Sequence, residues 1–340
     1  QSKQLPYEGA SHSPDRRQDP SGGGGGPARS TTLGLPLIRR DVRSTLSVEE
    51  YGAWARRQAD HLRARYGAKA SSSIERRANG TAFLANHNTD AAFYATIGFG
   101  TPLEHYNIIL DSGSADTWLA SSSCGTGCNG VKRFSPQASS TFKYLSRSFN
   151  IQYGHGSATG ELGKDVVQMA GFEVRDQTIA LVDGVTPGLL SYPVSGLMGL
   201  AFQGVAASGG TPFWMRLAGA GIWDMPLMSF CLTRFRGVDG ASNLEHGGFF
   251  TMGGVNSSLY RGEIDYVPLS IGAGTYWELP LKNLTVQGAS IPLPSGEISH
   301  AAIDTGTTLL GGPASLIDLI AAQIPGSSPG TGNYTDYFFY

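Results

Sequence analysis

Long apolar runs and charged residues are both scarce in this chain. No stretch of about 18 consecutive apolar residues occurs, so the sequence predicts no membrane-spanning helix. Charged residues make up 15% of the 340 residues and hydrophobic residues 40%, which is typical of a globular chain rather than a disordered one. This length is enough for two lobes, each with a sizeable core.

Cysteine is also scarce, with three residues in the whole chain. Cys124 and Cys128 are close enough to close a small loop by a disulfide, although the same spacing could serve a metal site. We favour the disulfide because no His and no further Cys lies nearby in the sequence. Cys231 is left over in an apolar, strand-like run, where we expect a thiol buried in the core.

An initiator Met and an apolar signal segment are missing too, since the chain begins with Gln1. We expect either that a signal has been removed or that the sequence is a fragment. Triplets of the form Asn-x-Ser/Thr are acceptors for N-glycans but also arise by chance. Four of them agree with a glycoprotein of the secretory pathway: Asn79, Asn256, Asn283 and Asn333.

Charge is distributed unevenly, although the net charge is only −2. Residues 1–80 contain 14 Lys and Arg against 8 Asp and Glu, whereas the remainder contains 11 against 19. Either the basic leader docks on the acidic body, or the two are unrelated solvated surfaces. A body this acidic makes nucleic acid a poor partner.

The leader itself divides into two parts. Residues 1–30 are polar and rich in glycine, which predicts a flexible linker. Residues 47–66 carry apolar residues at helical spacing behind a Ser-x-x-Glu capping box, which predicts a helix. The dibasic pair at 76–77 is either a processing site or ordinary surface.

From about residue 83, short alternating apolar runs separated by Gly and Ser turns predict an all-β fold. Helices are expected to be few, and the best candidate is 314–324. Five runs show the strand pattern most clearly: 92–97, 106–110, 148–153, 165–167 and 248–252.

An internal repeat is the most informative feature of the chain. Ile-Ile-Leu-Asp-Ser-Gly-Ser at 108–114 is matched by Ala-Ala-Ile-Asp-Thr-Gly-Thr at 301–307. The two Asp residues are 193 positions apart, which is the scale of one lobe. One copy alone is typical of an Asx turn, but two equivalent copies predict a pair of carboxylates, Asp111 and Asp304.

Two carboxylates brought together from equivalent loops suit general acid–base hydrolysis. At about 3 Å they share one proton, and their pKa values split apart. The ionised member deprotonates a water, and the protonated member donates to the scissile carbonyl oxygen. Gly113 and Gly306 permit tight turns and present backbone N–H groups to the carboxylates. The hydroxyls of Ser114 and Thr307 hold the outer carboxylate oxygens.

Several motifs, in order along the chain, resemble the pepsin family of bilobal aspartic endopeptidases, which includes cathepsin D. The resemblance runs over residues 31–313 and is more specific than either Asp motif alone. It implies a mainly β, bilobal acid protease fold behind an N-terminal pro-segment, with polypeptide substrates and neither a metal nor another cofactor. The motifs are the strand Ala-Thr-Ile-Gly-Phe-Gly-Thr-Pro at 95–102, Trp118, the hairpin Ile-Gln-Tyr-Gly-His-Gly-Ser at 151–157, Gly-Leu-Met-Gly-Leu-Ala at 196–201, and Leu-Pro-Leu at 35–37.

The resemblance also implies roles for individual residues. Asp111 and Asp304 would be the catalytic pair, and Ile109 would line a pocket beside them. Tyr153 would sit at the tip of a flap that closes over the substrate, with its hydroxyl near Trp118. The flap would include three further residues: Gly154, His155 and Gly156.

Some positions depart from the family pattern or extend it. His155 stands where a small hydroxyl residue is usual, and Ser112 stands where Thr is commoner. Arg65 and Tyr66 resemble the basic residue–Tyr pair that zymogens of the family place against the catalytic carboxylates. The chain's own pro-segment is therefore an expected partner.

The expected organisation is a disordered leader at 1–30, a pro-segment with one helix at 31–80, an N-terminal catalytic lobe at 81–228 and a C-terminal lobe at 229–340. Only 36 residues follow Asp304, whereas 88 separate Asp111 from Gly199 at the end of the 196–201 motif. We therefore expect an incomplete second lobe in this piece, with activity belonging to the completed protein.

A non-catalytic binder on the same fold is the alternative function. Members of the family that have lost their chemistry usually lack one Asp or the adjacent Gly, and both motifs are intact here. We therefore expect a monomeric aspartic endopeptidase that cleaves between bulky apolar residues at acidic pH. Its expected location is outside the cell or in the vacuole or lysosome.

Overall fold

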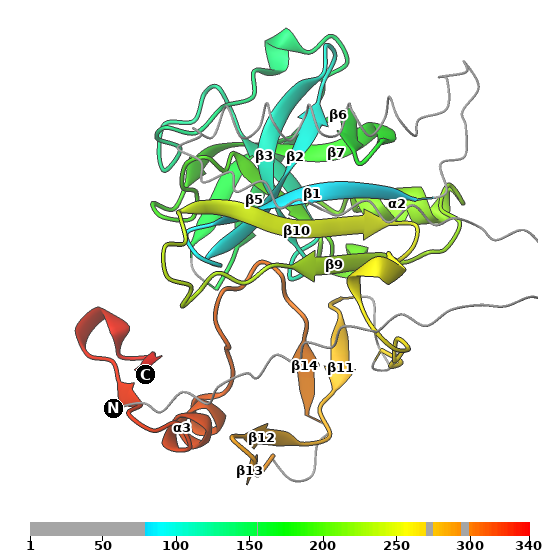
Figure 1. Ribbon diagram of the computed structural model, residues 1–340. Helices are drawn as coiled ribbons and strands as arrows, with labels where there is room; N and C mark the ends of the chain where they lie inside the picture. Colours follow the sequence, from blue (N-terminus) through cyan, green and yellow to red (C-terminus); the bar gives the residue numbers. More distant parts are fainter. Residues whose placement is uncertain (1–78, 155, 270–274, 294–298) are drawn as a thin grey trace, which may run out of the picture. The chain divides into compact units, whose positions relative to one another are not determined.

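The computed structural model describes residues 79–340, except for 155, 270–274 and 294–298 (Figure 1). The chain divides into a unit of residues 1–45 and a unit of residues 46–340, and all described residues belong to the second unit. The leader, the helix predicted at 47–66 and the dibasic pair lie outside the described residues.

One ten-stranded sheet dominates the described part of the chain, in the order β5-β6-β7-β4-β8-β3-β2-β1-β10-β9. A further pairing of β6 with β2 joins distant members of this order. At the other end, Figure 1 shows β1, β10 and β9 running side by side. The strands are β1 (Gly80–His87), β2 (Ala92–Phe99), β3 (Glu104–Asp111), β4 (Thr117–Ala120), β5 (Lys143–Gln152), β6 (Ser157–Met169), β7 (Phe172–Val185), β8 (Gly196–Gly199), β9 (Met228–Leu232) and β10 (Leu244–Met252).

The remaining elements are short. Three two-stranded sheets pair β11 (Glu278–Pro280) with β14 (His300–Ala302), β12 (Leu284–Val286) with β13 (Ala289–Ile291), and β15 (Ser328–Pro329) with β16 (Phe338–Phe339). The α-helices among the described residues are α2 (Phe213–Gly219) and α3 (Ala314–Ala322), and neither is long and apolar enough to cross a membrane. The 3-10 helices are η1 (Pro136–Ala138), η2 (Gln203–Val205), η3 (Ser257–Leu259) and η4 (Gly332–Tyr334).

These elements confirm the predicted mainly β fold. The helix predicted at 314–324 is α3, which ends two residues earlier, and each of the five predicted strand runs falls on a strand. The sheet continues across the proposed lobe boundary at 228–229, because β9 and β10 pair with each other and β10 pairs with β1. That boundary remains a prediction.

The strand β3 shows how the core supports the site. Successive side chains of a strand point to opposite faces. Tyr106, Ile108 and Leu110 are buried in one core cluster, while Ile109 packs against a second cluster on the other face. Each fully buried aliphatic side chain contributes roughly 1.5–3 kcal/mol. The strand that carries Asp111 is therefore fixed by apolar packing on both faces.

The three cysteines differ from one another. Cys124 and Cys128 are buried and form the predicted disulfide. The Arg133 guanidinium donates to both of their carbonyl oxygens, at 2.8 Å and 3.1 Å, and so closes the small loop. The prediction of a buried Cys231 is wrong: this thiol is free and only half-buried, because β9 is the last strand of the sheet and has a partner on one side only.

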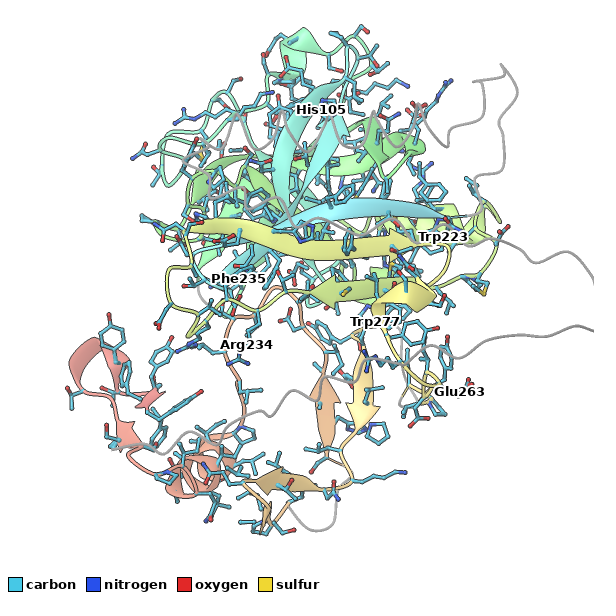
Figure 2. The ribbon with its side chains drawn as sticks, viewed as in Figure 1. His105, Trp223, Arg234, Phe235, Glu263 and Trp277 are labelled. Atoms are coloured by element: carbon cyan, nitrogen blue, oxygen red, sulfur yellow. A yellow bond between two sulfur atoms is a disulfide. The ribbon has the colours of Figure 1, made fainter. Side chains whose placement is uncertain are left out.

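A carboxylate clamp joins the β1–β2 turn to the loop between β9 and β10. Asp90 accepts hydrogen bonds from the Asn86 amide at 2.5 Å and from the backbone N–H groups of Phe235 and Arg236, each at 2.8 Å. Burial alone would raise the pKa of Asp90, but these bonds and the charge of Arg234 lower it overall. Figure 2 labels Arg234 and Phe235 on this loop.

We predict that Asp90→Ala lowers the melting temperature by roughly 2–6 °C at pH 6, since it removes a hydrogen-bonded carboxylate. A lowered pKa means that this stabilisation is present above the ordinary value of 3.8 and is lost as pH falls through the folded value. The difference from wild type should therefore shrink at pH 2. Asp239→Ala, at an exposed position of the same loop, is the control. If Asp90→Ala lowers the melting temperature by the same amount at pH 6 and at pH 2, the role assigned to this carboxylate is contradicted.

Candidate active site

The two repeated Asp residues lie at the ends of strands. Asp111 is the last residue of β3, in the middle of the large sheet, where it pairs with Gly199 of β8. Asp304 follows β14 by two residues. Asp111 is only 5% exposed, whereas Asp304 is half-buried. The same motif is therefore presented in two different environments.

The first carboxyl group is held by its own loop. The Gly113 N–H donates to Asp111 Oδ1 at 2.8 Å, and the Ser114 hydroxyl donates to Asp111 Oδ2 at 2.5 Å. Each oxygen thus has one fixed donor, which sets the orientation of the carboxyl group.

The second carboxyl group is held in the same way. The Gly306 N–H donates to Asp304 Oδ1 at 2.8 Å, and the Thr307 hydroxyl donates to Asp304 Oδ2 at 2.6 Å. The internal repeat of the sequence therefore corresponds to a repeat of hydrogen-bond geometry.

The glycines are needed because the loops face each other. A Cβ atom on Gly113 would overlap the carboxyl group of Asp304, and a Cβ atom on Gly306 would overlap that of Asp111. No side chain larger than hydrogen fits at either position without moving the opposite carboxyl group. This reciprocal contact brings the two predicted catalytic residues together.

Two hydroxyls that sequence reasoning missed tie the loops to each other. The Ser112 N–H donates to Thr305 Oγ1 at 3.0 Å, and the Thr305 N–H donates to Ser112 Oγ at 2.9 Å. The Ser112 hydroxyl donates onward to the carbonyl of Ile303 at 2.8 Å, and the Thr305 hydroxyl donates to that of Leu110 at 2.7 Å. The available signal was that both motifs carry a hydroxyl residue directly after Asp.

Burial and the nearby second carboxyl group change the pKa of Asp111. The pKa of Asp111 is raised to about 6, first by burial and then by the charge of Asp304 and a hydrogen bond with that carboxyl group. The bonds from the neighbouring hydroxyl and backbone N–H oppose this rise. A pKa near 6 keeps one proton on the pair in mildly acidic solution.

The predicted flap is the hairpin between β5 and β6. The Tyr153 N–H donates to the carbonyl of Gly156 at 2.8 Å, and Gly156 has φ +91°, a value that favours glycine. The Trp118 Nε1–H donates to the Tyr153 hydroxyl at 2.7 Å, and burial raises the pKa of Tyr153. Gly154 is exposed, and His155 lies outside the described residues.

The base of the flap is fixed by the segment after β7. The Ser157 N–H donates to Thr186 Oγ1 at 2.9 Å, and the Thr186 N–H returns a bond to the Ser157 carbonyl at 2.9 Å. Ile109 and Tyr153 both pack, half-buried, against the core cluster that contains Trp118. Of the predicted site residues, Arg65 and Tyr66 lie outside the described part of the chain.

Within the described residues, no group of three or more His, Cys, Asp or Glu side chains is placed to hold a metal ion. The groups that hold the two carboxylates are backbone N–H and hydroxyl donors. Such donors orient each carboxyl group without adding a charge to the site.

A known protein family and many curated proteins are similar to this chain. The family described as "Eukaryotic aspartyl protease" matches residues 92–337 of the chain. The chain belongs to this family. The resemblance to the pepsin family that the motifs carry is thereby confirmed.

Individual relatives agree with this assignment. Major aspartyl peptidase 1 of Cryptococcus neoformans var. grubii is 38% identical over 341 residues, which cover 92% of this chain and 69% of the relative. Pepsin A of Bos taurus is 36% identical over 245 residues, covering 72% of this chain and 63% of the relative. Pepsin A of Suncus murinus is 37% identical over 245 residues, which cover 72% of this chain and 60% of the relative. The matches thus span between 60% and 69% of the length of these curated relatives.

We predict that Tyr153→Phe lowers the free energy of unfolding by about 1–3 kcal/mol, because it leaves the buried Trp118 N–H without an acceptor. Denaturant titration followed by tryptophan fluorescence would measure the change. Tyr144→Phe is the matched control, since Tyr144 is 54% exposed and its hydroxyl can bond to water in either state. Equal effects of the two substitutions would contradict the role assigned to this bond.

Proposed function

We propose that the protein is an aspartic endopeptidase that hydrolyses polypeptides with a water molecule activated between Asp111 and Asp304. The observation that carries the proposal is that each carboxyl group lies against the glycine of the opposite motif and is held by one backbone N–H and one hydroxyl. Membership of the eukaryotic aspartyl protease family supports the same reaction class.

The reaction needs one proton on the pair. The ionised carboxylate takes a proton from the water as its oxygen attacks the scissile carbonyl carbon, and the protonated carboxyl donates to the carbonyl oxygen. In the second step the newly protonated carboxyl gives its proton to the leaving amine, and the other takes a proton from the tetrahedral intermediate as the C–N bond breaks. The pair thus returns to one proton without any covalent intermediate.

The raised pKa of Asp111 sets the working range. Activity is expected at acidic pH and is lost as pH rises through about 6, where the shared proton leaves. At much lower pH both carboxyls are protonated, so no base remains. The fixed donors limit the reorganisation needed during the reaction, because they already point at the carboxylate oxygens.

The substrate class follows from the surroundings of the pair. We infer an extended polypeptide with bulky apolar residues around the cleaved bond. In support, Ile109, Tyr153 and Leu189 pack half-buried against one core cluster, so each keeps part of its apolar surface exposed. Apolar side chains of a substrate would gain free energy by covering this surface.

We predict that Asp111→Asn and Asp304→Asn each abolish peptidase activity of the full natural protein, because neither variant can share one proton between two carboxyls. Cleavage of a denatured protein would be measured from pH 2 to pH 8, and melting temperatures would show that the variants fold. The wild type should lose activity through about pH 6 and should be blocked by pepstatin, an inhibitor typical of the family. Full activity in either variant, or inhibition by a chelator instead of pepstatin, would contradict the assignment of Asp111 and Asp304 as the catalytic pair.

We also propose that the chain's own segment 31–80 is an inhibitory pro-segment behind a flexible leader at 1–30, with the lobes at 81–228 and 229–340. The excess of basic residues before position 80 and of acidic residues after it supports electrostatic docking. Arg65 would neutralise the dyad, and Tyr66 would occupy the position of the water. Protonation of body carboxylates in acid would weaken the attraction and release the segment.

We predict that Arg65→Glu in the precursor produces activity near neutral pH, because a negative charge repels the dyad instead of neutralising it. Activity and mature N-termini would be followed from pH 7 to pH 3. Lys69→Glu changes charge four residues away and controls for the general loss of basic charge. If the Arg65→Glu precursor stays as inactive near neutral pH as the wild type, inhibition by the pro-segment is not electrostatic.

The location that we propose is the secretory pathway, with a secreted or vacuolar/lysosomal destination and a monomeric enzyme. The sequons at Asn79, Asn256 and Asn283 support it, because all three side chains are exposed and open to glycans.

A further inference from the structure

A second link joins the two aspartate loops, apart from the hydroxyls of Ser112 and Thr305. On the first side, the Leu200 N–H donates to the backbone carbonyl of Asp111 at 2.7 Å. The carbonyl of Leu200 in turn accepts the indole N–H of Trp277 at 2.9 Å. Trp277, which is labelled in Figure 2, immediately precedes β11. Leu200 is thus the one residue through which hydrogen bonds connect Trp277 to the first loop.

The backbone of the same tryptophan reaches the second loop. The Ile303 N–H donates to the carbonyl of Trp277 at 3.0 Å, and Ile303 directly precedes Asp304. The carbonyl of Ile303 accepts the hydroxyl of Ser112. A closed circuit of hydrogen bonds therefore passes from Asp111 through Leu200 and Trp277 to Ile303, and back to the first loop.

Aromatic packing holds Trp277 in this position. Its ring lies 4.6 Å from that of Phe202 and 5.5 Å from that of Trp214, measured between centroids. The Phe202 N–H also donates to the carbonyl of Thr275 at 3.1 Å, which anchors the chain just before the tryptophan. Leu200, the acceptor, is fully buried, so its carbonyl has no access to water as a substitute partner.

We propose that Trp277 is a positioning residue, whose indole N–H and backbone carbonyl together set the separation of the Asp111 and Asp304 loops. This inference rests on the proposed peptidase function and adds to it a residue outside both Asp motifs. The interaction between two carboxyl groups depends on their distance, and most steeply at short range in a buried site. A small displacement of the second loop would therefore weaken the effect of Asp304 on Asp111.

Trp214 offers a matched control within the same aromatic cluster. Its indole N–H donates to the carbonyl of Ala201 at 3.0 Å, one residue beyond the acceptor of Trp277. Its backbone lies in α2, which has no bond to the second aspartate loop among the described hydrogen bonds. Substitution of Trp214 therefore removes an equivalent buried bond without opening the circuit.

The test compares Trp277→Phe with Trp214→Phe in the full natural protein. Both variants keep an aromatic ring and lose one indole N–H. For Trp277→Phe we expect kcat to fall about ten- to a hundredfold with a smaller change in KM, since the reacting groups are misplaced rather than the substrate. The alkaline limb of the kcat/KM profile should move to lower pH, because the coupling that raises the pKa of Asp111 is weakened. For Trp214→Phe the profile should keep its wild-type position.

A second readout does not depend on turnover. Carboxyl-carbon NMR of the labelled protein would follow the titration of Asp111, whose pKa should fall in Trp277→Phe and stay unchanged in Trp214→Phe. If wild type cleaves no peptide, the proposed function fails, but the NMR comparison still decides the role of Trp277. If Trp277→Phe does not fold, 3-benzothienylalanine at position 277 preserves the ring shape and removes only the N–H. Equal titrations of Asp111 in the two variants would overturn the proposal.

Discussion

The contact between two carboxyl groups is the constraint on which the rest of the site depends. Each carboxyl occupies the space where a Cβ atom would lie on the glycine of the opposite motif, so Gly113 and Gly306 are required at these positions. Two carboxylates at such short range repel each other unless one proton is shared. The structure must therefore supply enough binding to hold the loops together against that repulsion, and it does so with hydrogen bonds and apolar packing.

The two aspartate loops are held in place in different ways. Asp111 ends a strand that is packed on both faces and paired with β8, so its loop is part of the rigid core. Asp304 follows a three-residue strand and is half-buried, and its loop is held by bonds to the first loop and to Trp277. The pKa of the deeper carboxyl, Asp111, is raised, and burial is the first cause of that rise.

Sequence reasoning found the features that depend on local pattern. The repeated Asp motifs, the five predicted strand runs, α3 and the Cys124–Cys128 bridge all show in residue spacing. The bonds between Ser112 and Thr305, and the route through Trp277, join residues that are distant along the chain, and no short motif marks such pairs. Cys231 was wrongly predicted to be buried because an apolar run indicates a strand but does not show whether that strand lies at the edge of its sheet.

The hydrogen bonds that hold the two carboxyl groups and their loops come from neutral donors, and this affects the pKa of Asp111. A Lys or Arg bonded to the carboxyls would hold them as firmly, but its charge would favour the ionised form and lower their pKa values. Hydroxyl, indole and backbone N–H groups orient the loops without adding a net charge. The pKa of Asp111 then depends mainly on burial and on the distance between the two carboxyl groups. That distance depends on hydrogen bonds between residues about 190 positions apart, such as Ser112 and Thr305, so the acid–base chemistry is a property of the tertiary structure rather than of either motif.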